Sequence, residues 1–312
     1  MVRTVLHRLG QAALTLLGGA LIVFALLQAA PGDPALRILT ARGQQDVAPE
    51  AVAAMRAELG LDDPFFVRLR DFLHGLLTGD LGTSWQTGRP VTDEFAGLVE
   101  ATAILTVSAL ALAVLGSLAL GLLAAAWPGR LPDLASRSVT LVCLVVPSFV
   151  FGILLLDVLV VELGFGRVIA DGTWGTVGLP ALTLALGSIA AWSRILRAGL
   201  LEAGSAPYLR VAQARGAGPA RRLFVHQLPN ALPAYLTLIG MESAFLLAGA
   251  PVVESVFTWP GIGRYTVQAV EARDMPVVTG FALLAIGLFV LTSLLVDLFN
   301  LWLDPRLRQE AT

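Results

Sequence analysis

Charge is scarce in this sequence, and lysine is absent from it. Charged residues make up 14% of the 312 residues and hydrophobic residues 56%, and the mean hydropathy is +0.77. Because soluble domains carry about 25% charged residues, the composition predicts a protein that spans a membrane. All 21 basic residues are arginines and the formal net charge is −2. A nucleic-acid-binding protein is not expected, since such proteins concentrate basic residues on one face.

Several catalytic motifs are missing as well. Without lysine the chain can hold neither a Walker A phosphate loop nor a Schiff-base lysine. The three histidines form no HExxH zinc motif, and no serine stands in a GxSxG frame. The single cysteine, Cys143, can form no disulfide within the chain. We therefore expect no catalytic residue, no metal site and no cofactor bound by this chain.

Six apolar stretches are long enough to cross a bilayer as helices, which takes about 20 residues each. They lie at about 9–30, 100–126, 138–161, 177–198, 230–254 and 277–302. The first could also be a secretory signal peptide, but its apolar run exceeds the usual length of about 7–15 residues. We expect a retained helix here and an all-α polytopic membrane protein with six spans.

The placement of arginine sets the expected orientation. With the N-terminus in the cytoplasm, the cytoplasmic segments are 1–8, 127–137, 194–229 and 304–312. They hold 12 of the 21 arginines but only four of the 23 acidic residues. The reverse orientation would place this excess of positive charge outside the cell. We therefore expect both termini to be cytoplasmic.

A long segment, 31–98, separates the first two spans and is extracytoplasmic in this orientation. Pro49 and Pro64 each open a run that reads as helical, and the second run repeats apolar residues at helical spacing. The glycine-rich stretch 79–88 reads as a loop. We expect a helical extracytoplasmic insertion between the first two spans.

The connection between the fourth and fifth spans, 201–229, has more internal structure than a simple link needs. Pro207 suits the first turn of a helix, Gly216 ends that helix, and Pro219 can open a second one. The connection is either an ordinary solvated loop that obeys the positive-inside rule or a docking surface for a partner. The physical arguments alone favour neither interpretation. The length of the connection favours a docking surface, because most helix connections are short.

The side chains of this connection fit such a surface. Tyr208, Val211 and Ala212 fall on one face of the first helix. Pro229 and Pro233 are expected to bend the chain ahead of the fifth span.

The same connection carries a recognisable spacing, Ala212-x3-Gly216-x9-His226-x-Leu228-Pro229. It resembles the cytoplasmic signature of permease subunits of binding-protein-dependent ABC importers, Glu-Ala-Ala-x3-Gly-x9-Ile-x-Leu-Pro. Here Arg210 stands for the Glu, Val211 for the first Ala and His226 for the Ile. These departures are typical of the peptide-importing branch of that family.

Other motifs along nearly the whole chain are similar to the same branch. They lie at 8–9, 30–34, 58–62, 79–84, 253–257, 260–264, 295–297 and 303–306. Jointly they identify the chain as resembling the B-type subunit of dipeptide and oligopeptide permeases, whose relatives move nickel or glutathione.

The resemblance implies a type I ABC importer permease fold in a bacterial or archaeal cytoplasmic (inner) membrane. It implies a second homologous permease subunit, two ABC ATPase subunits that bind ATP and Mg, and an extracytoplasmic substrate-binding protein. In the family, the short loop helix is a coupling helix that sits in a cleft of the ATPase. The matching residues here are Ala212, Gly216, Leu228 and Pro229. Position and chemistry add Tyr208, Arg210, Arg215, Arg221 and Arg222.

Glu242 is the acidic residue nearest the middle of a span, where burying a charge costs at least about 2.5–3.5 kcal/mol. It either faces the translocation path, where it could attract a peptide amino terminus, or makes a hydrogen bond at a helix–helix interface. Asp157, Glu254 and Asp297 lie near span ends, and we expect them to be interfacial acids that are solvated or paired with Arg.

Apart from the resemblance, the residues are compared with three other classes of membrane protein. An ion-coupled secondary transporter would favour inverted repeats and several ionisable residues at mid-membrane, and the sequence has neither. An intramembrane enzyme would need a paired catalytic set inside the spans, which is also absent. A structural assembly factor would share the topology but show no dependence on substrate.

Overall fold

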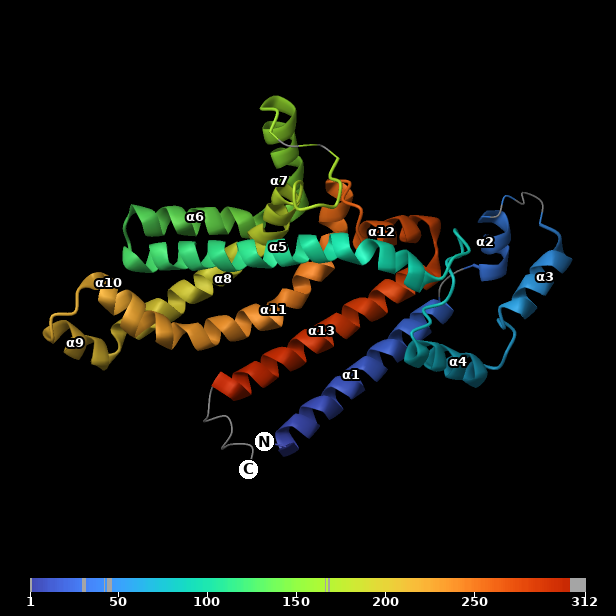
Figure 1. Ribbon diagram of the computed structural model, residues 1–312, viewed down its shortest axis with the longest axis horizontal. Helices are drawn as coiled ribbons and strands as arrows, with labels where there is room; N and C mark the ends of the chain where they lie inside the picture. Colours follow the sequence, from blue (N-terminus) through green and yellow to red (C-terminus); the bar gives the residue numbers. More distant parts are fainter. Residues whose placement is uncertain are drawn as a thin grey trace.

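The chain forms a bundle of long helices with shorter helices at its two ends (Figure 1). The computed structural model describes residues 2–29, 32–41, 43, 47–165, 167 and 169–303. The helices are α1 (Val2–Ala29), α2 (Pro34–Ala41), α3 (Pro49–Glu58), α4 (Phe65–Thr78), α5 (Val91–Ala126), α6 (Leu131–Val145), α7 (Ser148–Leu155), η1 (Leu156–Glu162), α8 (Gly178–Ser205), α9 (Pro207–Ala214), α10 (Pro219–Arg221), η2 (Arg222–Gln227), α11 (Leu228–Val256), α12 (Ile262–Ala272) and α13 (Met275–Leu303).

These ranges contain helices and one isolated bridge, Thr83–Pro90, but no strand. The predicted all-α class is therefore confirmed. Five helices are long and apolar enough to cross a membrane, and the bent pair formed by α6 and α7–η1 makes a sixth if it counts as one span.

The core of the bundle is the contact between α5 and α8, the most extensive between any two described helices. Every fourth residue of α5 from Leu105 to Gly121 is buried, and three of these five are Ala or Gly. Small side chains let two helices approach closely where lipid gives little hydrophobic drive for association. At Gly121, an added Cβ would lie 2.9 Å from Cδ2 of Leu196 on α8.

The other long helices are arranged around this pair. α11 packs against α8, α13 packs against α11, and α1 packs against α13 (Figure 1). The Ser117 and Tyr235 hydroxyls, 2.7 Å apart, link α5 to α11.

The expected third span, 138–161, falls on two helices that meet at 103°. The break lies at Val146 and Pro147. Proline disfavours a helical conformation in the residue before it, and Val146 is extended at φ −84° and ψ 125°. α7 consequently projects away from the bundle (Figure 1).

The fifth span also differs from expectation at its start. Pro229 and Pro233 do not interrupt the helix, because both lie within a single helical run of 38 residues, Pro219–Val256, which is curved in Figure 1. The turns just before Pro229 are π-helical, over Arg222–Gln227. This wider turn spares Val225 the clash that a proline makes with the carbonyl group four residues earlier.

The insertion between α1 and α5 holds α2, α3 and α4, and the last two helices begin where Pro49 and Pro64 predict. Phe24 of α1 contacts Phe65 and Phe72 of α4, with ring centroids 5.6 and 5.2 Å away. Ala30 and Pro31, at the junction of the expected first span and insertion, lie outside the described residues, as do Arg306 and Arg308.

The two ends of the bundle carry different short helices. The loop end carries α9, and the insertion end carries α2, α3 and α12 (Figure 1). A buried ion pair closes the loop end: Arg197 of α8 contacts both carboxylate oxygens of Asp133 on α6, at 2.7 and 2.8 Å. The Gly129 backbone N–H donates a third hydrogen bond to the same carboxylate, at 2.8 Å. Asp133 itself is almost fully buried.

We expect Arg197→Met to destabilise the protein strongly, because it leaves the buried Asp133 carboxylate without a counter-charge. Breaking one side of a buried pair costs about 3–5 kcal/mol, which thermal unfolding in detergent would register as a lowered Tm. The double variant with Asp133→Leu should regain much of the loss. Arg70→Met, which breaks the exposed Arg70–Asp71 pair, is the control and should change stability by about 0.5 kcal/mol or less. Equal losses in the two single variants would contradict this account.

Candidate functional site

The connection between α8 and α11 folds into the short helix α9 and a tight turn. Pro207 occupies the first turn of α9, and Ala206 before it is extended at ψ 144°. Gly216 ends the helix in the left-handed region at φ +84°. Its N–H donates to the Gln213 carbonyl at 2.9 Å. An added Cβ at Gly216 would meet no atom within 4 Å, so the backbone angle, and not crowding, requires glycine.

The apolar residues of α9 divide between two sides. Leu209 and Ala212 are buried against the protein, whereas Tyr208 and Val211 are 42% and 52% exposed. The single face expected for Tyr208, Val211 and Ala212 is therefore split. Ala212 helps to hold the helix in place, and the other two are free to meet a partner.

The arginines of this connection point largely to solvent. Arg210, Arg215 and Arg221 are exposed, and Arg222 is half-buried. Within the described part of the chain, none of these four forms an ion pair with an acidic residue. Nη1 of Arg222 donates to the Gln213 side-chain oxygen at 3.2 Å, which ties η2 to α9. The surface is thus positively charged and open.

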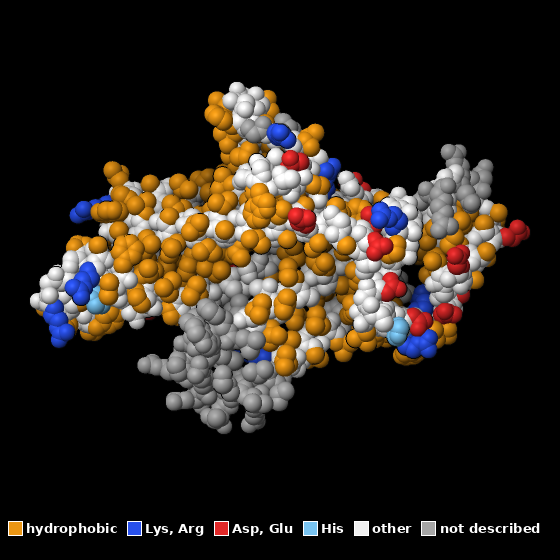
Figure 2. All heavy atoms as spheres, viewed as in Figure 1, with side chains coloured by type: hydrophobic (Ala, Val, Ile, Leu, Met, Phe, Trp, Pro, Cys, Tyr) orange, Lys and Arg blue, Asp and Glu red, His pale blue; other side chains and the backbone are white. Residues whose placement is uncertain are grey.

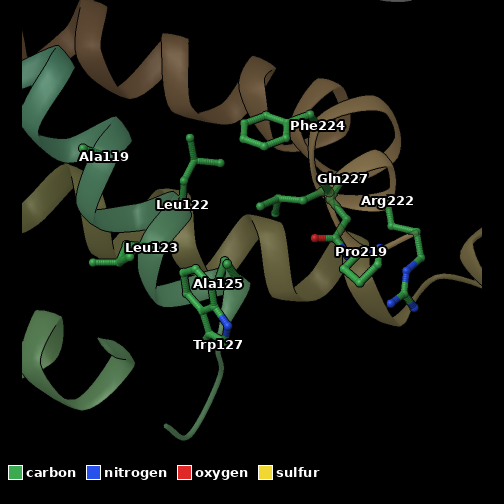
Figure 3. A pocket seen from close by; sticks show the side chains of 12 residues that line it. Ala119, Leu122, Leu123, Ala125, Trp127, Pro219, Arg222, Phe224 and Gln227 are labelled. Atoms are coloured by element: carbon green, nitrogen blue, oxygen red, sulfur yellow. The ribbon is translucent and has the colours of Figure 1, made fainter. Parts of the chain in front are cut away.

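A groove of about 590 Å³ lies at the loop end, between the end of α5 and the residues of α10 and η2. Leu122 and Leu123 of α5 form one wall and Phe224 and Gln227 of η2 the other, while the Arg222 guanidinium turns away from them (Figure 3). Leu228 is half-buried and Pro229 is exposed at the start of α11. All nine predicted loop residues therefore lie on one end of the molecule.

Glu242 makes a defined contact inside the bundle. The Trp192 indole N–H on α8 donates to Glu242 Oε2 on α11 at 2.6 Å. Trp192 is fully buried, whereas Glu242 is only half-buried. The carboxylate therefore lies at a helix–helix interface with part of its surface accessible.

Residues 117–309 match the family model described as "Binding-protein-dependent transport system inner membrane component", and residues 1–97 match the model of the N-terminal part of such components. The chain belongs to this family.

Its relatives in the family match over nearly their whole length. The Glutathione transport system permease protein GsiC of Escherichia coli (strain K12) is 35% identical over 308 residues, 99% of each chain. The protein of the same name from Pectobacterium atrosepticum is 38% identical over 294 residues, 94% of this chain and 95% of the relative.

A solved structure confirms the fold. The "Crystal structure of an amino acid ABC transporter with histidines" superposes with a TM-score of 0.53 at 22% identity, over 67% of this chain and 94% of that one. The predicted resemblance and the type I permease fold are confirmed. The protein is a multi-pass inner-membrane permease subunit of an ABC importer. The alternative of a stand-alone ion-coupled transporter is thereby set aside.

This permease has a buried carboxylate that its sequence did not predict. Glu254, expected to be an interfacial acid, is 0% exposed at the turn between α11 and α12. The Thr102 hydroxyl donates to its Oε1 and the Arg264 backbone N–H to its Oε2, both at 2.8 Å. The expectation was wrong because Thr102 comes from α5, 152 residues away. Asp157 is exposed, and the side chain of Asp297 lies outside the described residues.

A second buried acid at the insertion end, Asp274, follows α12. It accepts hydrogen bonds from the Ser84 hydroxyl at 2.5 Å and from the backbone N–H groups of Trp85 and Gln86. The insertion is thereby fastened to the turn between α12 and α13. The sequence around Asp274 carries no signal for this contact, because the three donor residues lie nearly 190 positions earlier in the chain.

We expect Gly261→Ala to loosen the turn between α11 and α12, because the added Cβ would overlap the Glu254 carboxylate. Overpacking of this kind costs about 1–3 kcal/mol, so the Tm in detergent should fall. Gly178→Ala is the matched control, since a Cβ there meets no atom within 4 Å. A Tm unchanged in Gly261→Ala would show that Glu254 is not held as described.

Proposed function

We propose that α9 docks into a cleft of a separate ABC ATPase. Through this contact, the conformational change that accompanies ATP hydrolysis is transmitted to the permease. The observation that carries the proposal is the combination of a helix closed by Gly216 with exposed Tyr208 and Val211 and with arginines that lack acidic partners in the described chain. Guanidinium groups suit bidentate contacts with carboxylates on a partner.

The surroundings of α9 favour transmission of a movement into the membrane. α9 follows α8 directly and leads through η2 into α11, and both neighbours belong to the core of the bundle. The Asp133–Arg197 pair fastens α8 to α6 close to the same end. A displacement of α9 would therefore bias the whole bundle between two arrangements.

The remaining partners follow from the family. A binding-protein-dependent importer works with ATPase and substrate-binding subunits, and we propose two ATPases, which bind ATP and Mg, and a second homologous permease. We propose that this end and both termini are cytoplasmic, and the excess of arginine at the loop end supports this orientation. The insertion then faces the substrate-binding protein.

The cargo we propose is a small peptide, with glutathione, itself a tripeptide, among the candidates. Support comes from the relatives, which are named as glutathione transport permeases and match over the full chain. Glu242 is the residue we propose on the translocation path, where its partly accessible carboxylate can attract an ammonium group.

We expect Gly216→Glu to abolish coupled uptake while the protein still inserts into the membrane. The substitution strains the turn and adds a negative charge to the docking surface. Loss of about 1.4 kcal/mol of docking free energy already weakens the affinity for the ATPase roughly tenfold. Uptake of labelled peptide in cells and copurification of the ATPase measure the effect.

The matched control for this variant is Gly88→Glu at the insertion end. Gly88 also has a positive φ, +69°, and open space around it. It should retain ATPase copurification. Normal uptake in Gly216→Glu would overturn the assignment of the docking loop.

We expect Glu242→Gln to weaken uptake of peptides that carry a free amino terminus, by roughly tenfold if about 1.4 kcal/mol of charge attraction is lost. N-acetylated peptides should be affected much less. Competition for uptake between free and N-acetylated forms of one peptide measures the preference, with Glu202→Gln at the exposed loop end as control. An unchanged preference would assign Glu242 to helix packing alone.

A further inference from the structure

A cleft between α6 and α8 near the loop end is not accounted for by the docking of α9. Its volume is about 330 Å³. It is lined by Leu134, Arg137, Ser138, Thr140, Leu141 and Arg194. Two arginines from different helices therefore border one small cavity.

Neither arginine is in direct contact with a carboxylate of the described chain. Arg137 and Arg194 are exposed and form no ion pair with any described carboxylate. Asp133, one turn before Arg137, is already satisfied by Arg197 and the Gly129 N–H. On the face shown in Figure 2, this end carries arginine and histidine side chains but no Asp or Glu.

The position of the cleft along the helices is that of a membrane interface. Arg137 lies six residues into α6, about 9 Å at 1.5 Å per residue. Around it, Val139 and Leu141 on α6 and Ile195 on α8 are 52%, 60% and 44% exposed. Apolar side chains this exposed on membrane-spanning helices are solvated by acyl chains, so the two guanidinium groups lie beside lipid.

The cleft also offers a neutral donor and an apolar track. The Ser138 hydroxyl is exposed and makes no hydrogen bond within the described residues. Leu134 and Leu141, seven residues apart on α6, are 50% and 60% exposed and lie on one side of the helix. Cations and a hydroxyl beside an apolar strip match a phosphate joined to an acyl chain.

We propose that this cleft binds the phosphate of an anionic phospholipid from the bilayer leaflet at the loop end. Arg137 and Arg194 hold the phosphate oxygens by charge-assisted hydrogen bonds, and Ser138 donates a third bond. An acyl chain runs from there past Leu141, which lies on the membrane side of the arginines. The lipid phosphate supplies the direct ion-pair partner that neither arginine has among the described residues. Since α8 leads directly into α9, the bound lipid braces the helix that carries the docking loop.

Native mass spectrometry of the purified importer complex tests the site, with phosphatidylglycerol, cardiolipin or phosphatidylethanolamine added in turn. Each arginine near an anionic surface contributes about 1 kcal/mol, so Arg137→Gln with Arg194→Gln should weaken retention of the two anionic lipids by roughly 10- to 30-fold. Retention of phosphatidylethanolamine should not change. Arg137→Lys with Arg194→Lys keeps the charge and should restore much of the binding.

The matched control is Arg130→Gln, which removes an exposed arginine at the same end that does not line the cleft. It should retain the anionic lipid. The proposal is overturned if the double Gln variant binds anionic lipid as well as the unaltered complex does. It is also overturned if inorganic phosphate displaces the lipid at equal concentration, or if lipid binds the isolated chain but not the complex, since a second subunit would then cover the cleft. Size-exclusion chromatography of each variant separates loss of the site from loss of the fold.

Discussion

The close approach of α5 and α8 is the contact on which the rest of the permease depends. Small residues at every fourth position of α5 let α8 lie against its backbone, and Gly121 leaves no room for a Cβ. With lipid outside, dense packing and not exclusion of water holds such helices together. α11 is set against this pair, so α9, which joins α8 to α11, is placed by it as well.

Buried carboxylates add hydrogen bonds between elements that pack together, and they lie at both ends of the bundle. Asp133 joins α6 to α8 at the loop end, while Glu254 and Asp274 fasten the turns before and after α12. Each accepts at least two hydrogen bonds, and at least one of them comes from a group more than 60 residues away in the sequence. Because a buried polar group is costly unless it is hydrogen-bonded, these contacts hold in register the helices and turns that close packing brings together.

The sequence predicted those features that depend on neighbouring residues. The helical class, the helices after Pro49 and Pro64, and the turn at Gly216 all follow from local composition and backbone preference. The break at Pro147 was not predicted, because proline is tolerated in many membrane helices and does not set the bend angle. The burial of Glu254 was not predicted either, since Thr102 reaches it across the fold. The position of Glu242 beside Trp192 likewise depends on how α8 and α11 meet.

The unbroken run from Pro219 to Val256 has a mechanical consequence. At 1.5 Å per residue, its 38 residues measure at most about 57 Å along the helix axis, well above the roughly 30 Å of a hydrocarbon core. One end adjoins α9 and the other carries Glu254 beneath α12. If this curved helix moves as one piece, about 5° of tilt at its middle displaces each tip by at most roughly 2–3 Å. A small rotation at the loop end would thus displace the opposite end of the helix by about the length of a hydrogen bond. No helix would have to unfold.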